Sequence, residues 1–439
     1  MKRNIWTFRD SGLGQRVHTP GRWDWLSYTV IAGVSGALLC ALVKLAGGFA
    51  RGDSEAVMYS SVMLAHGHWA CAYRVPGNQA LSGPIYPLIS AFTQWITRIG
   101  FSAPFPSSGQ IGVGCHDALA SFISWEKTTP VYPSVLATAI VAWVALWLSG
   151  TAVLQSLKVL GRRSIWQFTL VLVVTPPVFL AVQENYHPQD LWALAMIFVA
   201  VALWLHARTY CAGVFLALAV MSQPYTLLGV LVILVVSTPR GRRDLTIAGT
   251  LTALVTTTLT YFTFGSRGLS ATLIGTGDTS IHAGTWMSEL HLTSGEGIGV
   301  SRVGPLAAAL LLSWWCHRRQ PDIAHDAVAF LGLLAACWSL RLVFEENLFG
   351  YYCAATGVTL ILRDFVARRL AWSTIIWLAV VLIAFDDIRH QATPWEHWPT
   401  WIWQVLIAPT AFLIAFLPLR HSLHGARDTS TLNGLPTQL

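Results

Sequence analysis

The first hydrophobic run of the chain, residues 25–46, reads WLSYTVIAGVSGALLCALVKLA. A transmembrane helix needs about 20 predominantly apolar residues to cross the hydrocarbon core of a bilayer, and this run has that length. It follows a basic leader, is too long for the core of a signal peptide, and lacks a small-residue cleavage site. We therefore expect it to be retained as a membrane-spanning helix.

Runs of the same kind recur along the whole chain, with short polar joints between them. Of the 439 residues, 54% are hydrophobic and 11% are charged, whereas an ordinary soluble domain has about 25% charged residues. This composition excludes a soluble fold and predicts one all-α, polytopic transmembrane domain, residues 25–418, with about twelve helices. The expected helices span residues 25–46, 131–154, 165–183, 190–207, 211–222, 224–237, 244–264, 303–316, 325–343, 349–363, 371–386 and 401–418.

The two segments on either side of Gln223-Pro224 are each short for a full crossing. Proline removes a backbone donor and breaks a helix, and broken helices in membranes are buried in protein. We expect these segments to form such a broken pair.

The basic residues lie at the ends of the apolar runs, as in Lys158/Arg162/Arg163, rather than in one patch. An even number of crossings puts the leader 1–24 and the tail 419–439 on the same side as these clusters. The positive-inside rule makes that side the cytoplasm. The net charge of +7 thus indicates topology and does not indicate nucleic-acid binding, and the chain is expected to be a multi-pass plasma-membrane protein.

The two longest polar segments, residues 47–130 and 265–302, fall on the opposite, outer side, and loops of this length are usually functional or disordered. Within the first, the apolar stretch 84–100 is expected to be an interfacial or re-entrant helix, because a full crossing would move the next basic cluster outside. Cys71 and Cys115 share this loop. An oxidising exterior allows a disulfide between them, although spacing alone does not fix the pairing.

Asp53 follows the first helix at once, in the sequence Gly52-Asp53-Ser54-Glu55. A carboxylate at the outer surface is well placed to remove the proton of a sugar hydroxyl that attacks an anomeric carbon. Such general-base catalysis contributes roughly 10² to 10⁴ in rate. In the alternative interpretation Asp53 caps a helix that starts near Ser54. Glu55 is the second candidate for the base.

Other polar side chains at the expected outer surface are candidates for substrate binding. Residues 184–190 read ENYHPQD, in which His187 is a binding candidate and Asp190 is alternatively the cap of the next helix. The second outer loop adds His282 and Arg302, which are otherwise ordinary solvated loop residues.

Arg341 lies just inside the expected outer surface, within an apolar run. Placing an arginine in such a run costs free energy, so this residue is a candidate for a functional site. Its planar guanidinium suits a phosphate. The alternative is an ion pair with Glu345 at i,i+4 helical spacing. The sequence contains no Gly-rich phosphate loop and no paired-cysteine or His-Glu-x-x-His metal motif, so we expect neither a metal nor another cofactor.

The order of these features resembles the GT-C superfamily of membrane glycosyltransferases. Residues 83–89, GPIYPLI, are similar to the Pro-Pro-Leu-Tyr-Pro-Leu-Leu element of that superfamily, with Gly83 in place of the first proline. Residues 213–224 resemble its middle helix pair, with Gln223 where lysine is usual. Residues 346–352, ENLFGYY, resemble a late outer-face Tyr-Tyr motif of glycosyltransferase family 87, which includes actinobacterial mannosyl- and arabinofuranosyltransferases.

The resemblance implies an inverting, metal-independent transfer on the outer face of the membrane, with Asp53 as the base. The donor would be a polyprenyl-phosphate sugar, with mannose or arabinofuranose as the sugar, and the acceptor an envelope glycolipid or polysaccharide. The implied fold is a GT-C-like bundle with interfacial helices in its first outer loop. Donor and substrate binding would fall to a set of cationic, polar and aromatic residues: Arg341, His187, Tyr351, Tyr352, Glu346, His282 and Arg302.

Two other classes of function stay open. A transporter or flippase for a lipid or lipid-linked sugar would show charged or broken helices near the membrane midplane in two related halves. The sequence predicts only one broken pair, and its polar residues gather at one surface. A non-catalytic membrane assembly protein would leave the outer group of Asp53, His187 and Arg341 unexplained.

Overall fold

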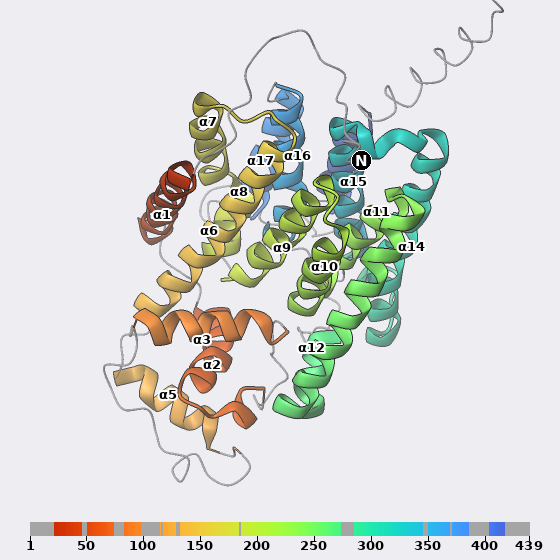
Figure 1. Ribbon diagram of the computed structural model, residues 1–439. Coiled ribbons are helices and arrows are strands. Elements are labelled where there is room, and N and C mark those ends of the chain that lie inside the picture. The colour runs from red at the N-terminus through yellow and green to blue at the C-terminus, as the bar shows by residue number, and fades with distance from the viewer. Residues whose placement is uncertain are drawn as a thin grey trace, which may run out of the picture.

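The part of the chain that the structure describes is largely helical. The computed structural model describes residues 22–45, 51–73, 83–97, 115, 117–128, 132–183, 186–273, 285–345, 350–368, 371–385 and 404–417. Over these residues it contains α-helices and short 3₁₀ helices and no strand. Figure 1 shows them as one bundle of packed helices. The predicted all-α class is confirmed for this part of the chain.

Six of the described helices are long and apolar enough to cross a membrane. They are α1 (Arg22–Leu45), α6 (Tyr132–Ser156), α9 (Pro188–Leu205), α12 (Pro239–Leu273), α14 (Ser294–Arg319) and α15 (Ala327–Phe344). These helices are those of a multi-pass membrane protein. Twelve crossings are not confirmed, because other expected segments form shorter apolar helices, such as α17 (Trp372–Phe385) and the helix Gln404–Leu417.

The helix expected over residues 165–183 is broken in two. Helices α7 (Arg162–Val173) and α8 (Pro176–Gln183) are bent by 54° at the break. The cause is the pair Pro176-Pro177, which supplies no backbone donors and clashes with the preceding turn. The expectation of one continuous helix was therefore wrong.

The break expected at Gln223-Pro224 is present. Helix α10 (Thr209–Ser222) ends at Gln223, whose backbone is extended, with φ −148° and ψ 115°. A 3₁₀ turn, η2 (Pro224–Thr226), then leads into α11 (Leu227–Val236). Within the described residues, the helix pairs α7/α8 and α10/α11 are thus each interrupted next to a proline.

The second outer loop, expected over residues 265–302, is helical at both ends of its described part. Helix α12 continues to Leu273 through a kink at Gly265, where φ is +70°, a conformation that glycine adopts without strain. On the other side, α13 (Trp286–Glu289) is followed by α14, which begins at Ser294. A capping box between Thr293 and Glu296 fixes that start. The loop expected over residues 265–302 is therefore shorter in the structure, because its two ends belong to α12 and α14.

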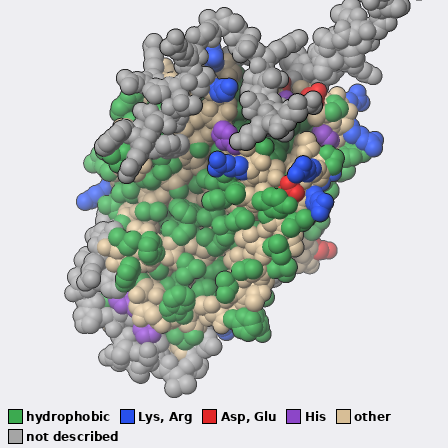
Figure 2. Space-filling view, in the orientation of Figure 1, with side chains coloured by type: hydrophobic (Ala, Val, Ile, Leu, Met, Phe, Trp, Pro, Cys, Tyr) green, Lys and Arg blue, Asp and Glu red, His purple; other side chains and the backbone are tan. Residues whose placement is uncertain are grey.

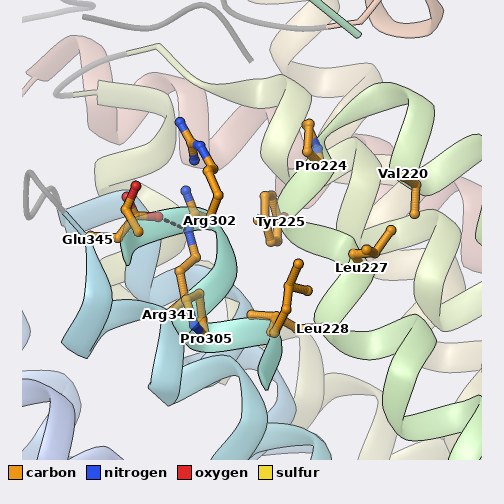
Figure 3. Close-up of a pocket in the computed structure, with 11 residues that line it drawn as sticks. Val220, Pro224, Tyr225, Leu227, Leu228, Arg302, Pro305, Arg341 and Glu345 are labelled. Carbon is orange, nitrogen blue, oxygen red and sulfur yellow. Dashed lines mark hydrogen bonds and ion pairs between the residues drawn. The ribbon is translucent and has the colours of Figure 1, made fainter. Parts of the chain in front are cut away.

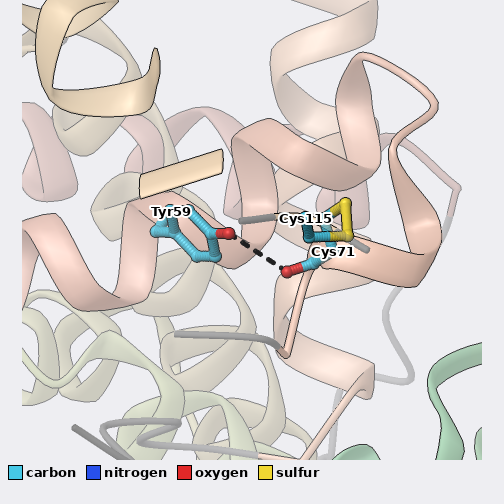
Figure 4. Close-up of a disulfide and its surroundings, with 3 residues drawn as sticks. All are labelled: Tyr59, Cys71 and Cys115. Carbon is cyan, nitrogen blue, oxygen red and sulfur yellow. Dashed lines mark hydrogen bonds between the residues drawn. A yellow bond between two sulfur atoms is a disulfide. The ribbon is translucent and has the colours of Figure 1, made fainter. Parts of the chain in front are cut away.

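Four short helices from the first outer segment gather at one end of the bundle, here called the α3 end: α2 (Arg51–Ala65), η1 (Trp69–Cys71), α3 (Ile85–Thr97) and α5 (Ala118–Thr128). The Tyr59 hydroxyl donates to the Cys71 carbonyl at 3.2 Å, and Cys71 forms a disulfide with Cys115 (Figure 4). The disulfide that spacing left open is therefore present.

Helix α2 begins at Arg51, so Asp53 is its third residue. The alternative interpretation, in which Asp53 caps a helix that starts near Ser54, is wrong because Arg51 and Gly52 already belong to the helix. The side chains of Asp53 and Glu55 lie outside the described residues.

A buried ion pair links the last described helices of the bundle. The Arg363 guanidinium, in α16 (Ala354–Val366), donates to the Asp364 carboxylate at 2.9 and 2.6 Å and to the Ile414 carbonyl at 2.7 Å. Asp364 in turn accepts from the Ala371 amide just before α17, at 3.0 Å. Because each charged group has partners, this pair can be buried, and it ties together the last three helices.

The surface of the bundle is that of a protein in lipid. Figure 2 shows hydrophobic side chains over the middle and lower part of the visible face, whereas most of the visible Lys and Arg side chains lie in its upper half. Large apolar side chains such as Val34, Leu251 and Phe262 are more than half exposed. A soluble monomer rarely exposes so large an apolar area.

We predict that the α3 end faces outward and that the α11–α12 junction faces the cytoplasm. In a Cys211→Ser background, a membrane-impermeant maleimide should label Ser124→Cys, at an exposed position of α5, in intact cells. The same reagent should label Thr238→Cys, also exposed, only after permeabilisation. The opposite labelling pattern would show that the α3 end faces the cytoplasm and would contradict the predicted topology.

Candidate functional site

A cavity of about 420 Å³ lies where α10, η2 and α11 face α14 and α15 (Figure 3). Its walls are mainly apolar, and its polar side chains are few. In Figure 3, Arg302, Arg341 and Glu345 lie on one side, Tyr225 lies between, and Val220 and Leu227 lie opposite. The complete lining is Val220, Pro224, Tyr225, Leu227, Leu228, Ser301, Arg302, Pro305, Leu306, Arg341 and Glu345.

Arg341 is the most constrained side chain of this site. Its guanidinium lies over the rings of Tyr225 and Tyr352, at 4.4 and 4.1 Å from their centroids. Its Nε donates to the Glu345 carboxylate one turn further along. In the described part of the chain this is its one hydrogen bond, so both Nη groups keep donors for a ligand.

The i,i+4 ion pair that sequence offered as the alternative role of Arg341 is therefore present. It does not exclude ligand binding, because Glu345 occupies the Nε side only. Among the residues that line the cavity, Arg302 and Arg341 are cationic and Glu345 is acidic. The planar guanidinium of an arginine suits a phosphate group.

His187 is joined to Arg341 through aromatic rings. Its imidazole stacks on Tyr351, with centroids 3.9 Å apart and planes at 11°, and Tyr351 contacts Tyr352 at 4.5 Å. These tyrosines belong to the 3₁₀ turn η4 (Gly350–Cys353) before α16. His187, Tyr351, Tyr352 and Arg341 are thus joined by successive ring contacts between segments far apart in sequence.

The first turn of α9 holds His187 in place. The Gln189 amide donates to His187 Nδ1 at 2.8 Å, and Asp190 Oδ2 lies 3.9 Å from the same nitrogen. His187 occupies the N-cap position of α9, and its side chain makes no capping hydrogen bond. Asp190 is already the third residue of this helix, so the expectation that Asp190 caps it was wrong.

Tyr225 lies between the arginines and the apolar wall of the cavity. It is not among the site residues predicted from the sequence. Its hydroxyl donates to the Asp190 carbonyl at 2.9 Å, while its ring covers Arg341 and contacts Trp338 at 5.6 Å. The break at Pro224 places it there. The available signal was an aromatic residue directly after a proline break, although a tyrosine in an apolar run usually only packs.

The first outer segment reaches the wall of this cavity. The Gly83 amide donates to the Ser222 carbonyl at 3.1 Å, at the end of α10 and two residues before Pro224. Next to it, Tyr86 is buried beside Tyr186, which directly precedes His187. The GPIYPLI element and the Gln-Pro break, which are separate in sequence, are therefore neighbours.

The sequence-predicted site residues divide into two groups. His187, Arg341, Tyr351 and Tyr352 form one connected cluster, and Arg302 lines the same cavity as Arg341. The remaining candidates lie outside the described residues, either completely or in their side chains: Glu346 and His282, Asp53 and Glu55. Their approach to the cavity stays a prediction.

Comparison with protein-family models, with curated proteins and with solved structures found no match. Among the described residues, no group of three or more His, Cys, Asp and Glu side chains is arranged to hold a metal ion. The case for a function therefore depends on the site and on the sequence motifs.

We predict that the Arg341–Glu345 pair is needed to compensate charge. Glu345→Leu leaves the guanidinium buried without its partner and should destabilise the protein by about 3–5 kcal/mol. The double variant Arg341→Met/Glu345→Leu should recover most of this loss, because an apolar pair fills the same space. Denaturant unfolding in detergent micelles measures both effects.

Asp322→Leu is the matched control, because Asp322 lies in an exposed pair with His325 and should contribute little. A double variant as unstable as Glu345→Leu alone would show that the loss comes from packing rather than from uncompensated charge.

Proposed function

We propose that this protein is a membrane glycosyltransferase that moves a sugar from a polyprenyl-phosphate donor to an envelope glycolipid or polysaccharide on the outer face. One observation carries the proposal. The cavity combines an apolar wall with a side that carries two arginines, Arg302 and Arg341. This combination suits an anionic amphiphile, and a sugar phosphodiester on a prenyl chain has this chemical form.

The two arginines are suited to the donor phosphate. Arg302 and Arg341 line one side of the cavity, and the Arg341 guanidinium packs against the rings of Tyr225 and Tyr352. A guanidinium that is already oriented loses less side-chain entropy when it binds an anion. We assign the phosphodiester oxygens to its Nη edge and to Arg302.

The prenyl chain is assigned to the apolar wall formed by residues such as Val220, Leu227, Leu228 and Leu306. Burial of apolar surface contributes about 25 cal/mol per Å². A chain of isoprene units therefore gains binding energy here without any specific polar contact. The site would recognise the lipid by its apolar character and the head by its charge.

In the proposed reaction, a carboxylate takes the proton of the acceptor hydroxyl as its oxygen bonds to the anomeric carbon. The bond from that carbon to the phosphate oxygen breaks, and its electron pair leaves with the phosphate. The phosphate charge thereby grows from −1 to −2, and Arg302 and Arg341 stabilise this growing charge. The GT-C resemblance gives the base role to Asp53, in the first turn of α2, with Glu55 as the second candidate.

A second candidate function is supported by the two interrupted helices. The breaks in α7/α8 and in α10/α11 both lead into the site, because α8 packs against η4 and the α10 break delivers Tyr225. Interrupted helices are typical of transporters. A flippase for lipid-linked sugars would bind the same donor but would form no new glycosidic bond, so formation of a covalent product separates the two functions.

We predict that Asp53→Asn nearly abolishes transfer and leaves folding intact. The change keeps the shape of the side chain and removes the basic carboxylate. Sugar transfer should fall by about two to four orders of magnitude, or about 3 to 5 kcal/mol in the barrier. The assay is transfer of radiolabelled mannose or arabinofuranose from polyprenyl phosphate by the purified protein in liposomes.

Donor binding should survive this change, because the phosphate is assigned to the arginines. A variant that keeps more than a small fraction of wild-type transfer would remove Asp53 as the base, and Glu55→Gln would then be assayed in the same way.

We predict that Arg302→Gln and Arg341→Lys weaken donor binding. Each loses charge-assisted hydrogen bonds worth about 1.5–3 kcal/mol, so the Kd for a polyprenyl phosphate should rise by about one to two orders of magnitude. Arg318→Gln is the control, because Arg318 lies on an exposed helix end over Trp314, 4.3 Å from its ring. Equal weakening in all three variants would point to nonspecific charge and contradict the assignment.

A further inference from the structure

Helix α14 contains a proline at the wall of the cavity. Pro305 lies inside the helix Ser294–Arg319, and both Pro305 and Ser301, one helical turn earlier, line the cavity. A proline has no backbone N–H, so it cannot donate the hydrogen bond that an α-helix directs to the carbonyl four residues earlier. The Ser301 carbonyl therefore lacks its regular helical donor.

The neighbouring polar groups do not replace this donor. Within the described residues, no side chain and no amide of another element donates to the Ser301 carbonyl. The Ser301 hydroxyl donates to the Ile298 carbonyl at 3.2 Å. The Tyr225 hydroxyl, which belongs to the same cavity, donates to the Asp190 carbonyl. The Ser301 carbonyl thus stays available as a hydrogen-bond acceptor at the cavity wall.

The position of this carbonyl requires a donor from inside the cavity. Helix α14 is long and apolar enough to cross a membrane, and Ser301 is buried, with 3% of its surface exposed. Lipid chains donate no hydrogen bonds, and a carbonyl without a partner in apolar surroundings is unfavourable. A proline is tolerated in a membrane helix where protein, water or a cavity satisfies the freed group. Here the cavity has that role.

The two arginines determine which kind of donor the ligand can bring. Arg302 directly follows Ser301, and Figure 3 shows Pro305 on the same side of the cavity as Arg302 and Arg341. These cations would repel an ammonium group, because like charges interact strongly where water is scarce. A neutral hydroxyl group carries no such penalty. The same arginines suit a phosphate.

From these observations we infer that the Ser301 carbonyl accepts a hydrogen bond from a hydroxyl group of the bound head. The cavity would thereby prefer a lipid phosphate that carries a sugar over the same lipid phosphate without one. Pro305 is a positioning residue for this contact, because it keeps the carbonyl free of a helical donor. The inference rests on the proposed function and adds the element that distinguishes the loaded lipid carrier from the empty one.

The test is Pro305→Ala, which returns an N–H to the Ser301 carbonyl. The Kd values of polyprenyl phosphate, polyprenyl-phosphate mannose and polyprenyl-phosphate arabinofuranose are measured for the full-length protein in liposomes. The wild type should bind a sugar-bearing lipid more tightly than polyprenyl phosphate. Pro305→Ala should reduce this preference by about two- to tenfold, the range for one neutral hydrogen bond. Its melting temperature should not fall, because a helix interior favours alanine over proline.

Leu306→Ala is the matched control on the same wall, because it removes apolar contact without changing a backbone donor. It should weaken all three lipids equally and leave the preference unchanged.

A second measurement uses sugar-bearing lipids that lack one hydroxyl group. One of them should bind the wild type more weakly than the complete lipid does, and Pro305→Ala should bind the two alike. An unchanged preference in Pro305→Ala, together with the same loss for every such lipid in both proteins, would overturn the inference. Equal binding of sugar-bearing and bare lipid by the wild type would overturn it as well, while leaving the phosphate assignment intact. Failure of all three lipids to bind would overturn the proposed function itself.

Discussion

Arg341 is permanently charged and lies in a bundle whose other side chains are mostly apolar. The residues of the site surround this side chain and stabilise its charge. Glu345 pairs with it, and the guanidinium packs against the rings of Tyr225 and Tyr352. The Glu345 carbonyl in turn accepts from the Gln404 amide at 2.8 Å, which ties the last described helix to the site. Because a lone buried charge is so costly, these segments must come together if the arginine is to remain buried.

The two helix breaks follow from the same constraint on polar groups. Non-helical backbone is tolerated at membrane depth only where protein or a cavity satisfies it. The turn at Pro224 packs against α9 and borders the cavity, and it delivers Tyr225 to the arginine. The break before Pro176 redirects the chain so that α8 packs against η4 and the following turn presents His187 to Tyr351. Both proline breaks thus lead to residues of the candidate site.

Much of the bundle could be predicted from hydrophobic length, because a run such as residues 188–205 must be helical if it lies in lipid. The α7/α8 break was missed although Pro176-Pro177 was visible, because the apolar run continues through it. The start of α14 was missed for a different reason. Its first residues, SGEGIGVSR, contain little hydrophobic signal, and only the Thr293–Glu296 capping box marks them.

For the site, Arg341 could be predicted because a charge within an apolar run is exceptional. Tyr225 could not be distinguished from other aromatic residues of such runs, since its role comes only from what packs against it. His187 and Tyr351 were separately suggested by motifs, but their stacking depends on how α9 and η4 meet in three dimensions. Local patterns therefore suggested several of the side chains that meet at the cavity, and tertiary packing determines which of them are in contact.

The central claim is that this cavity supports the transfer of a sugar from a lipid carrier. The most direct test is the composition of envelope glycolipids and polysaccharides in a strain that lacks the protein, compared with the same strain carrying the wild-type gene. The account predicts that one class of glycan loses a defined sugar residue, that the unused polyprenyl-phosphate sugar accumulates on the outer face, and that the wild-type gene reverses both changes. An unchanged set of glycans, or accumulation of the lipid-linked sugar on the cytoplasmic face only, would contradict it and favour a transporter.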